Sequence, residues 1–99
     1  MRISQSQAQK IREIAESVLG SSVQVWLFGS RVDDSASGGD IDLLISTNQV
    51  VESPAQLSGR LTVAVMRLFY GRKVDILLEA PNLKHQSIHD IAKKQGVLL

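Results

Sequence analysis

The 99-residue sequence contains no cysteine, so it can form neither a disulfide nor a thiolate metal site, which fits a reducing compartment. No apolar run reaches the length of a membrane span, and the first residues lack the hydrophobic segment of a secretion signal. The net charge is only +1, so the sequence lacks the excess of basic residues that is typical of nucleic-acid-binding proteins. We therefore expect a cytoplasmic protein that contacts neither a membrane nor a nucleic acid directly.

Internal repeats, low-complexity tracts and linkers are also missing, and the length suits one modest hydrophobic core. Residues 1–99 are therefore predicted to form a single domain. Apolar spacing, capping residues and turn signals predict three helices and three strands. The helices are expected at 4–19, 54–69 and 84–95, and the strands at 23–28, 40–46 and 74–78. Residues 97–99 are expected to add a short edge strand or to dock apolar surface.

The element order predicts a small two-layer domain of the α+β (α/β) class. The link between the first two strands is shorter than a parallel crossover requires, so this pair is expected to be antiparallel. Ser4 or Ser6 is expected to cap the first helix, and Ser53-Pro54 marks the start of the second.

Two carboxylates stand at the start of the second strand, at Asp40 and Asp42, and a third, Asp75, lies in the last strand. Successive side chains of a strand point to opposite faces, so Asp40 and Asp42 share one face while Ile41 takes the other. Neighbouring carboxylates repel each other, and a cation between them would relieve this repulsion. We expect the helices to cover the apolar face and to leave the carboxylate face open.

A family resemblance follows from these residues. The segment Phe28-Gly29-Ser30-Arg31, followed nine residues later by Asp40-Ile41-Asp42-Leu43, resembles the signature of the DNA polymerase beta-like nucleotidyltransferase superfamily. Asp75 in Val-Asp-Ile-Leu matches the third carboxylate of that family. The short chain looks most like the minimal nucleotidyltransferase (MNT) type, and the resemblance covers nearly all of it.

This resemblance implies a mixed sheet with helices packed on one face and the active site on the other. It implies that Asp40, Asp42 and Asp75 are catalytic and hold two Mg²⁺ ions, the usual partners of carboxylate oxygens and substrate phosphates. Gly29, Ser30 and Arg31 would bind the nucleotide, and the reaction would move AMP, or another nucleoside monophosphate, from ATP or a related triphosphate to a hydroxyl. Small relatives of this type are often antitoxins paired with a HEPN-domain toxin, and some of them inactivate the toxin by attaching AMP to a tyrosine, which is the acceptor expected for this chain.

Two other functions remain open beside this one. The chain could neutralise a helical partner by complex formation without turnover, or it could modify an RNA or a small molecule. It departs from the usual family pattern at Asp33-Asp34 and at Gly39. The chain also lacks the helical lobe that binds acceptors in antibiotic nucleotidyltransferases, so recognition of the base and acceptor would depend on a partner chain or on self-association, for which Trp26 and residues 97–99 are candidate contacts.

Several other residue types invite a functional interpretation, and a structural one is favoured for each. His85 and His89 have the spacing of a metal pair on a helix, but the sequence offers no evident third ligand, so a solvated helix face is expected. Trp26 is expected in the core. Four basic residues are expected to form salt bridges or to be solvated rather than to bind phosphate: Arg60, Arg67, Arg72 and Lys73.

Overall fold

The computed structural model describes residues 3–29 and 40–99. Helix α1 (Gln5–Leu19) begins after Ser4, whose hydroxyl accepts a hydrogen bond from the Gln7 backbone N–H at 3.0 Å. The Gln7 side chain accepts one in return from the Ser4 N–H at 2.9 Å, which completes a capping box. Gly20 ends the helix. The predicted first helix and its end are confirmed, and of the two expected caps Ser4 is the one observed.

A four-stranded mixed sheet forms the centre of the molecule, with the order β3-β2-β1-β4. Its strands are β1 (Gln24–Phe28), β2 (Ile41–Ser46), β3 (Val74–Glu79) and β4 (Val97–Leu98). Strand β1 pairs antiparallel with both β2 and β4, whereas β2 and β3 run parallel. The expected antiparallel pair is confirmed, and of the two expectations for the last residues the edge strand is the one observed.

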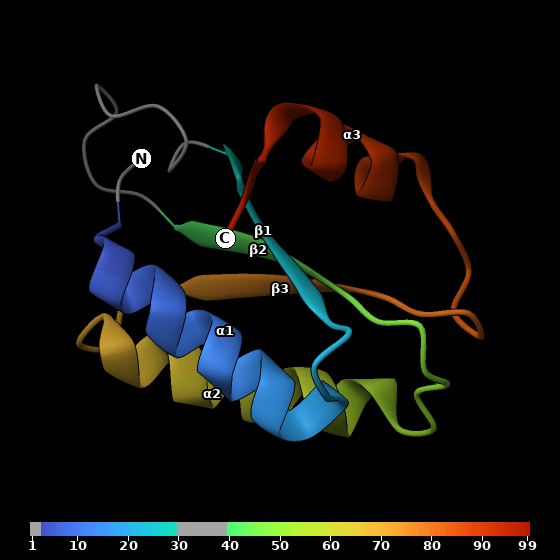
Figure 1. Cartoon of the computed structure of the whole chain (residues 1–99), viewed down its shortest axis with the longest axis horizontal. Helices are drawn as coiled ribbons and strands as arrows, with labels where there is room; N and C mark the ends of the chain where they lie inside the picture. The colour runs from blue at the N-terminus through green and yellow to red at the C-terminus, as the bar shows by residue number, and fades with distance from the viewer. Residues whose placement is uncertain (1–2, 30–39) are drawn as a thin grey trace.

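Helices α1 and α2 (Pro54–Leu68) lie side by side against one face of the sheet (Figure 1). Pro54 stands in the first turn of α2, where its missing N–H breaks no helical hydrogen bond. Within the described residues, the Ser53 side chain makes no capping hydrogen bond, although Ser53 is the capping residue. The core between these helices and the sheet includes fully buried side chains: Ile11, Ala15, Leu27, Ile41, Leu43, Leu61 and Val65.

Helix α3 (Ser87–Gln95) lies across the opposite face of the sheet (Figure 1). Leu44 on this face and Ala92 of α3 are both fully buried, so α3 covers the apolar middle of the sheet. The expectation that all helices pack on one face is therefore wrong for α3. The helix also begins later than predicted, because Gln86, and not a residue near Lys84, is its N-terminal cap.

The predicted α+β class, with a small mixed sheet and three helices, is confirmed. None of the helices in residues 3–29 and 40–99 combines the length and the apolar character needed to cross a membrane.

Candidate active site

The parallel pairing of β2 and β3 sets Asp42 directly beside Asp75 in the sheet. Asp40 immediately precedes β2, and the neighbouring Ile41 N–H donates a hydrogen bond to the Lys73 carbonyl at 3.0 Å. Because Ile41 points into the core between the sheet and α1–α2, the alternation of strand side chains turns Asp40 and Asp42 toward the other face. The three predicted carboxylates thus meet at one end of the sheet, on the face that α1 and α2 do not cover.

An ammonium group lies between two of these carboxylates. Lys73 Nζ is 3.6 Å from Asp40 Oδ2 and 4.0 Å from Asp75 Oδ2. Two oxygens this close to one nitrogen are separated by well under about 10 Å, the limit beyond which no shared metal pair could bridge them. The side chains of Lys73, Asp40 and Asp75 are each about half exposed or more, so water and small ligands can reach them.

Asp42 is a partly buried carboxylate beside Asp75 in the sheet. Its partial burial raises its pKa above the ordinary value, and the negative charges of Asp75 and Asp40 raise it further. The Lys73 ammonium works in the opposite direction without reversing the shift. Among residues 3–29 and 40–99, Lys73 is thus the cation that lies beside the carboxylates, and its charge does not offset the repulsion at Asp42.

Gly29 closes the site from the β1 side. It directly follows Phe28, the residue that pairs with Asp42 across the sheet, and its φ is +74°. A Cβ atom at this position would lie 3.2 Å from Asp42 Cγ and would collide with Asp42 Oδ2. Glycine was expected here for a close approach of phosphate; the structure shows that it also makes room for a carboxylate.

The other two expected nucleotide-binding residues, Ser30 and Arg31, lie outside the described residues, as do Asp33-Asp34 and Gly39. The structure therefore places only Gly29 of the predicted Gly-Ser-Arg turn.

The donor set fits a hard divalent cation. Carboxylate oxygens are the ligands that Mg²⁺ prefers, and Mg²⁺ sites use one or two protein carboxylates together with water and substrate phosphates. The crowding that raises the pKa of Asp42 and the ammonium held between Asp40 and Asp75 both indicate a place that attracts positive charge.

A second group of potential ligands lies at the other end of β3, where Glu79, His85 and His89 place one ligand atom each within 4.8 Å of one another. The expectation that the histidines lie on a solvated face without a third ligand is wrong. His85 precedes α3, His89 is only 3% exposed, and Glu79 accompanies them. The sequence signal that was missed is the acidic residue at the end of the last predicted strand.

The hydrogen bonds of this second group explain it without a metal. The Gln86 N–H donates to His89 Nδ1 at 2.9 Å, and His89 Nε2 donates to the Leu78 carbonyl at 3.0 Å. Glu79 Oε1 accepts from Lys93 at 2.6 Å and from the Ser46 hydroxyl at 2.7 Å. Because these donor and acceptor atoms are already satisfied, we interpret the group as the contact that holds α3 against β2 and β3.

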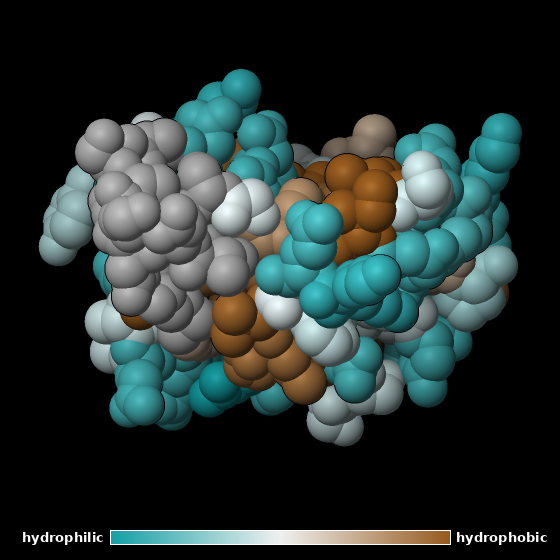
Figure 2. Space-filling model, turned by 90° about the horizontal axis from the view of Figure 1, so that it is seen from above, coloured by the Kyte–Doolittle hydropathy of each residue, from teal (hydrophilic) through white to brown (hydrophobic). Residues whose placement is uncertain are grey.

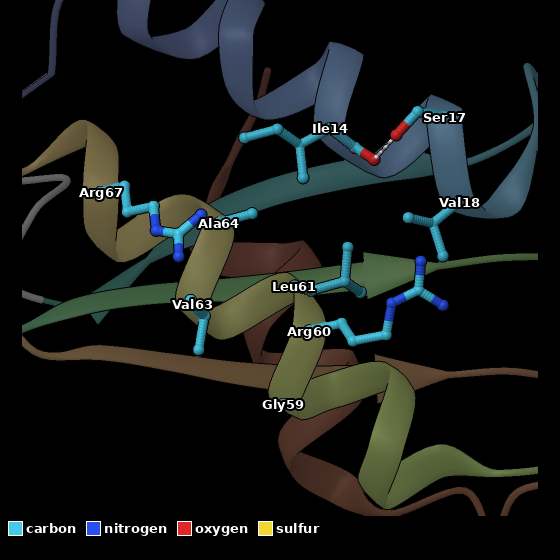
Figure 3. A pocket seen from close by; sticks show the side chains of 9 residues that line it. All are labelled: Ile14, Ser17, Val18, Gly59, Arg60, Leu61, Val63, Ala64 and Arg67. Atoms are coloured by element: carbon cyan, nitrogen blue, oxygen red, sulfur yellow. Dashed lines mark hydrogen bonds between the residues drawn. The ribbon is translucent and has the colours of Figure 1, made fainter.

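A groove of about 580 Å³ lies between α1 and α2, far from both groups (Figure 3). Ile14, Val18 and Val63 contribute apolar surface, and Arg60 and Arg67 extend from separate turns of α2. This groove belongs to the helical layer, so the sheet separates both arginines from the three carboxylates. Among the basic residues considered from the sequence, Lys73 is at the carboxylates, where it forms the expected ion pairs.

Residues 8–99 match the family model of the nucleotidyltransferase domain. The matched segment includes Gly29 and all three carboxylates. No curated protein matches the chain.

Proposed function

The chain belongs to the nucleotidyltransferase domain family, and we propose that it transfers a nucleoside monophosphate, AMP from ATP, to a hydroxyl group. One observation carries this proposal beyond family membership: Asp42 and Asp75 are direct neighbours in the sheet, and Asp40 shares a cation with Asp75. The Asp40 and Asp75 side chains are also 46% and 54% exposed, so a substrate can reach them.

Mg²⁺ bound here would neutralise phosphate charge and lower the pKa of the acceptor hydroxyl. In our proposal Asp40 and Asp42 hold the cation on the triphosphate side, and Asp75 joins them on the acceptor side. Gly29 allows the backbone to approach the phosphates, while Ser30 and Arg31 supply hydrogen bonds to them. The residues of the chain thereby orient the triphosphate for in-line attack by the acceptor oxygen.

For the acceptor we propose a tyrosine of a helical HEPN-type toxin, so that the chain acts as an antitoxin. This finer step rests on the resemblance to minimal nucleotidyltransferases. It is supported by apolar surface that a partner, or a second copy of the chain, could cover. Figure 2 shows brown apolar areas among teal polar ones on the face that carries α3. Four large apolar residues of α3 and β4 are between 36% and 49% exposed: Ile88, Ile91, Val97 and Leu98. Trp26 is partly buried and pairs with Leu44 and Leu98 of the neighbouring strands.

Incubation of the protein and its partner with labelled ATP and Mg²⁺, followed by mass spectrometry of the partner, tests the proposal. The wild type should add one nucleotide mass, and Asp42→Asn and Asp75→Asn should add none while remaining folded. The second candidate function, neutralisation by binding alone, predicts a different outcome. If the wild type adds no nucleotide and the Asp variants neutralise the partner equally well, the chain is a binding module.

A further inference from the structure

The position of Lys73 poses a problem for a metal-binding site. Its ammonium lies 3.6 Å from Asp40 and 4.0 Å from Asp75, in the space between two of the proposed metal ligands. A divalent cation held by the same two carboxylates would compete with this ammonium for their oxygens. Like charges at such short range also repel each other.

We propose that Lys73 is the built-in counter-cation of the active site, which a divalent cation displaces from Asp40 and Asp75 and which then pairs with the phosphate oxygens of the bound nucleotide. This inference rests on the proposed function, because it assumes that the three carboxylates bind a metal and a triphosphate. Lys73 is a positioning residue in the metal-free protein and a phosphate-binding residue in the loaded one.

The backbone of Lys73 is fixed while its side chain can move. The Lys73 carbonyl accepts a hydrogen bond from the Ile41 N–H at 3.0 Å, which holds the start of β3 to the start of β2. The Lys73 side chain is 68% exposed, and both ion-pair distances are long. Exposed ion pairs of this kind are weak, so the ammonium can exchange with another cation at little cost.

Lys93 provides a contrast within the same protein. Its ammonium lies 2.6 Å from Glu79 Oε1, and that oxygen also accepts a hydrogen bond from Ser46. This pair is closer and less exposed, because the side chains of Lys93 and Glu79 are 37% and 17% exposed. Lys93 is therefore committed to one partner, whereas Lys73 is shared between two partners and held loosely by both.

The proposal predicts opposite effects of one substitution on two ligands. Lys73→Met removes the competing charge, so Mn²⁺ alone should bind about five-fold more tightly. The same substitution removes a phosphate contact, so Mg²⁺–ATP should bind about five-fold more weakly. A purely structural role of Lys73 would weaken the binding of both ligands together.

Electron paramagnetic resonance titration of Mn²⁺ and calorimetric titration of Mg²⁺–ATP, both on the full chain, measure these affinities. Lys10→Met is the matched control, because Lys10 is an exposed lysine of α1 and its loss changes the net charge equally. It should leave both affinities within two-fold of the wild type. Lys73→Arg keeps the charge and should also leave Mn²⁺ affinity nearly unchanged, which separates charge from a folding defect.

The outcomes distinguish this inference from the proposed function. If the wild type binds Mn²⁺, Asp42→Asn abolishes that binding and Lys73→Met changes neither affinity, the inference is overturned and the metal site stands. The inference is also overturned if Lys73→Met weakens the binding of both Mn²⁺ and Mg²⁺–ATP while Lys73→Arg binds both normally. If the wild type binds neither Mn²⁺ nor Mg²⁺–ATP, the inference and the proposed active site are both overturned.

Discussion

Gly29 and Asp42 fit together because glycine has no side chain. The Asp42 carboxylate occupies the space that a Cβ on Gly29 would need, and Cγ of Asp42 lies 3.2 Å from that position. Gly29 has a φ of +74°, a backbone conformation that glycine adopts readily and that side chains disfavour. One residue thus ends a strand and leaves space for the Asp42 carboxylate.

Gly29→Ala should destabilise the protein by about 2–3 kcal/mol, since it adds backbone strain at positive φ and a collision with Asp42. Gly71→Ala is the matched control, because Gly71 has a φ of +84° but nothing lies within 4 Å of an added Cβ. The control should lose only about 1 kcal/mol through strain. Urea denaturation of both variants measures the difference, and equal losses would show that the contact with Asp42 has no energetic weight.

Asp42→Asn should stabilise the metal-free protein while abolishing its response to Mg²⁺. Burial and the neighbouring Asp75 and Asp40 raise the pKa of Asp42, so its ionised form costs stability. That cost is complete above the pKa of the folded protein and disappears as the pH falls below 3.8, the ordinary value. Thermal melts at pH 7 should show a higher Tm for the variant by a few degrees.

Added Mg²⁺ should raise the Tm of the wild type, because a ligand of the folded state stabilises it, but should not raise that of Asp42→Asn. Asp90→Asn serves as the control: hydrogen bonding to His85 lowers the pKa of Asp90, so its loss should bring no gain in stability. A lower Tm for Asp42→Asn than for the wild type in metal-free buffer contradicts the prediction.

Glu79→Gln should destabilise the protein by about 1–2 kcal/mol at pH 7, because it weakens the bonds to Lys93 and Ser46. Burial opposes ionisation of Glu79, but hydrogen bonds from Lys93 and Ser46 prevail and lower its pKa below 4.5. Its contribution is therefore present above pH 4.5 and is lost as the pH falls through the lowered pKa.

Denaturation at pH 7 and at pH 3 should show the difference between wild type and Glu79→Gln shrinking with acid. Glu16→Gln, on the exposed side of α1, should have little effect at either pH. A Glu79→Gln effect that does not change with pH would mean that packing, and not charge, explains the loss.

His89→Ala should cost about 2 kcal/mol, since it removes a buried ring that bonds the Gln86 N–H and the Leu78 carbonyl. His85→Ala should cost less than about 0.5 kcal/mol, because that side chain is largely exposed. Urea denaturation with and without a chelator compares the two variants. Equal losses, together with destabilisation of the wild type by the chelator, would indicate that Glu79, His85 and His89 bind a metal.

The sequence alone was sufficient to predict the local elements. The Ser4 cap, the apolar spacing of α1 and α2 and the runs of apolar residues in β1 and β2 are signals between near neighbours, and the structure confirms the elements. The short link between the first two strands also predicted their antiparallel pairing. The three carboxylates were named from strand alternation and from the resemblance to one family.

Contacts between distant segments decided the rest. Helix α3 covers the sheet face that carries Leu44, and both Leu44 and Ala92 of α3 are fully buried. The apolar spacing of a nine-residue helix shows which of its residues share a face, but not which face of the sheet they contact. The sequence also did not predict the position of Lys73 between Asp40 and Asp75. It did not predict the hydrogen bond from His89 to the Leu78 carbonyl either. Helical and strand periodicities report which residues share a face, but register and packing decide which faces meet. Only the folded chain therefore shows that β2 and β3 run parallel in the register that sets Asp42 beside Asp75.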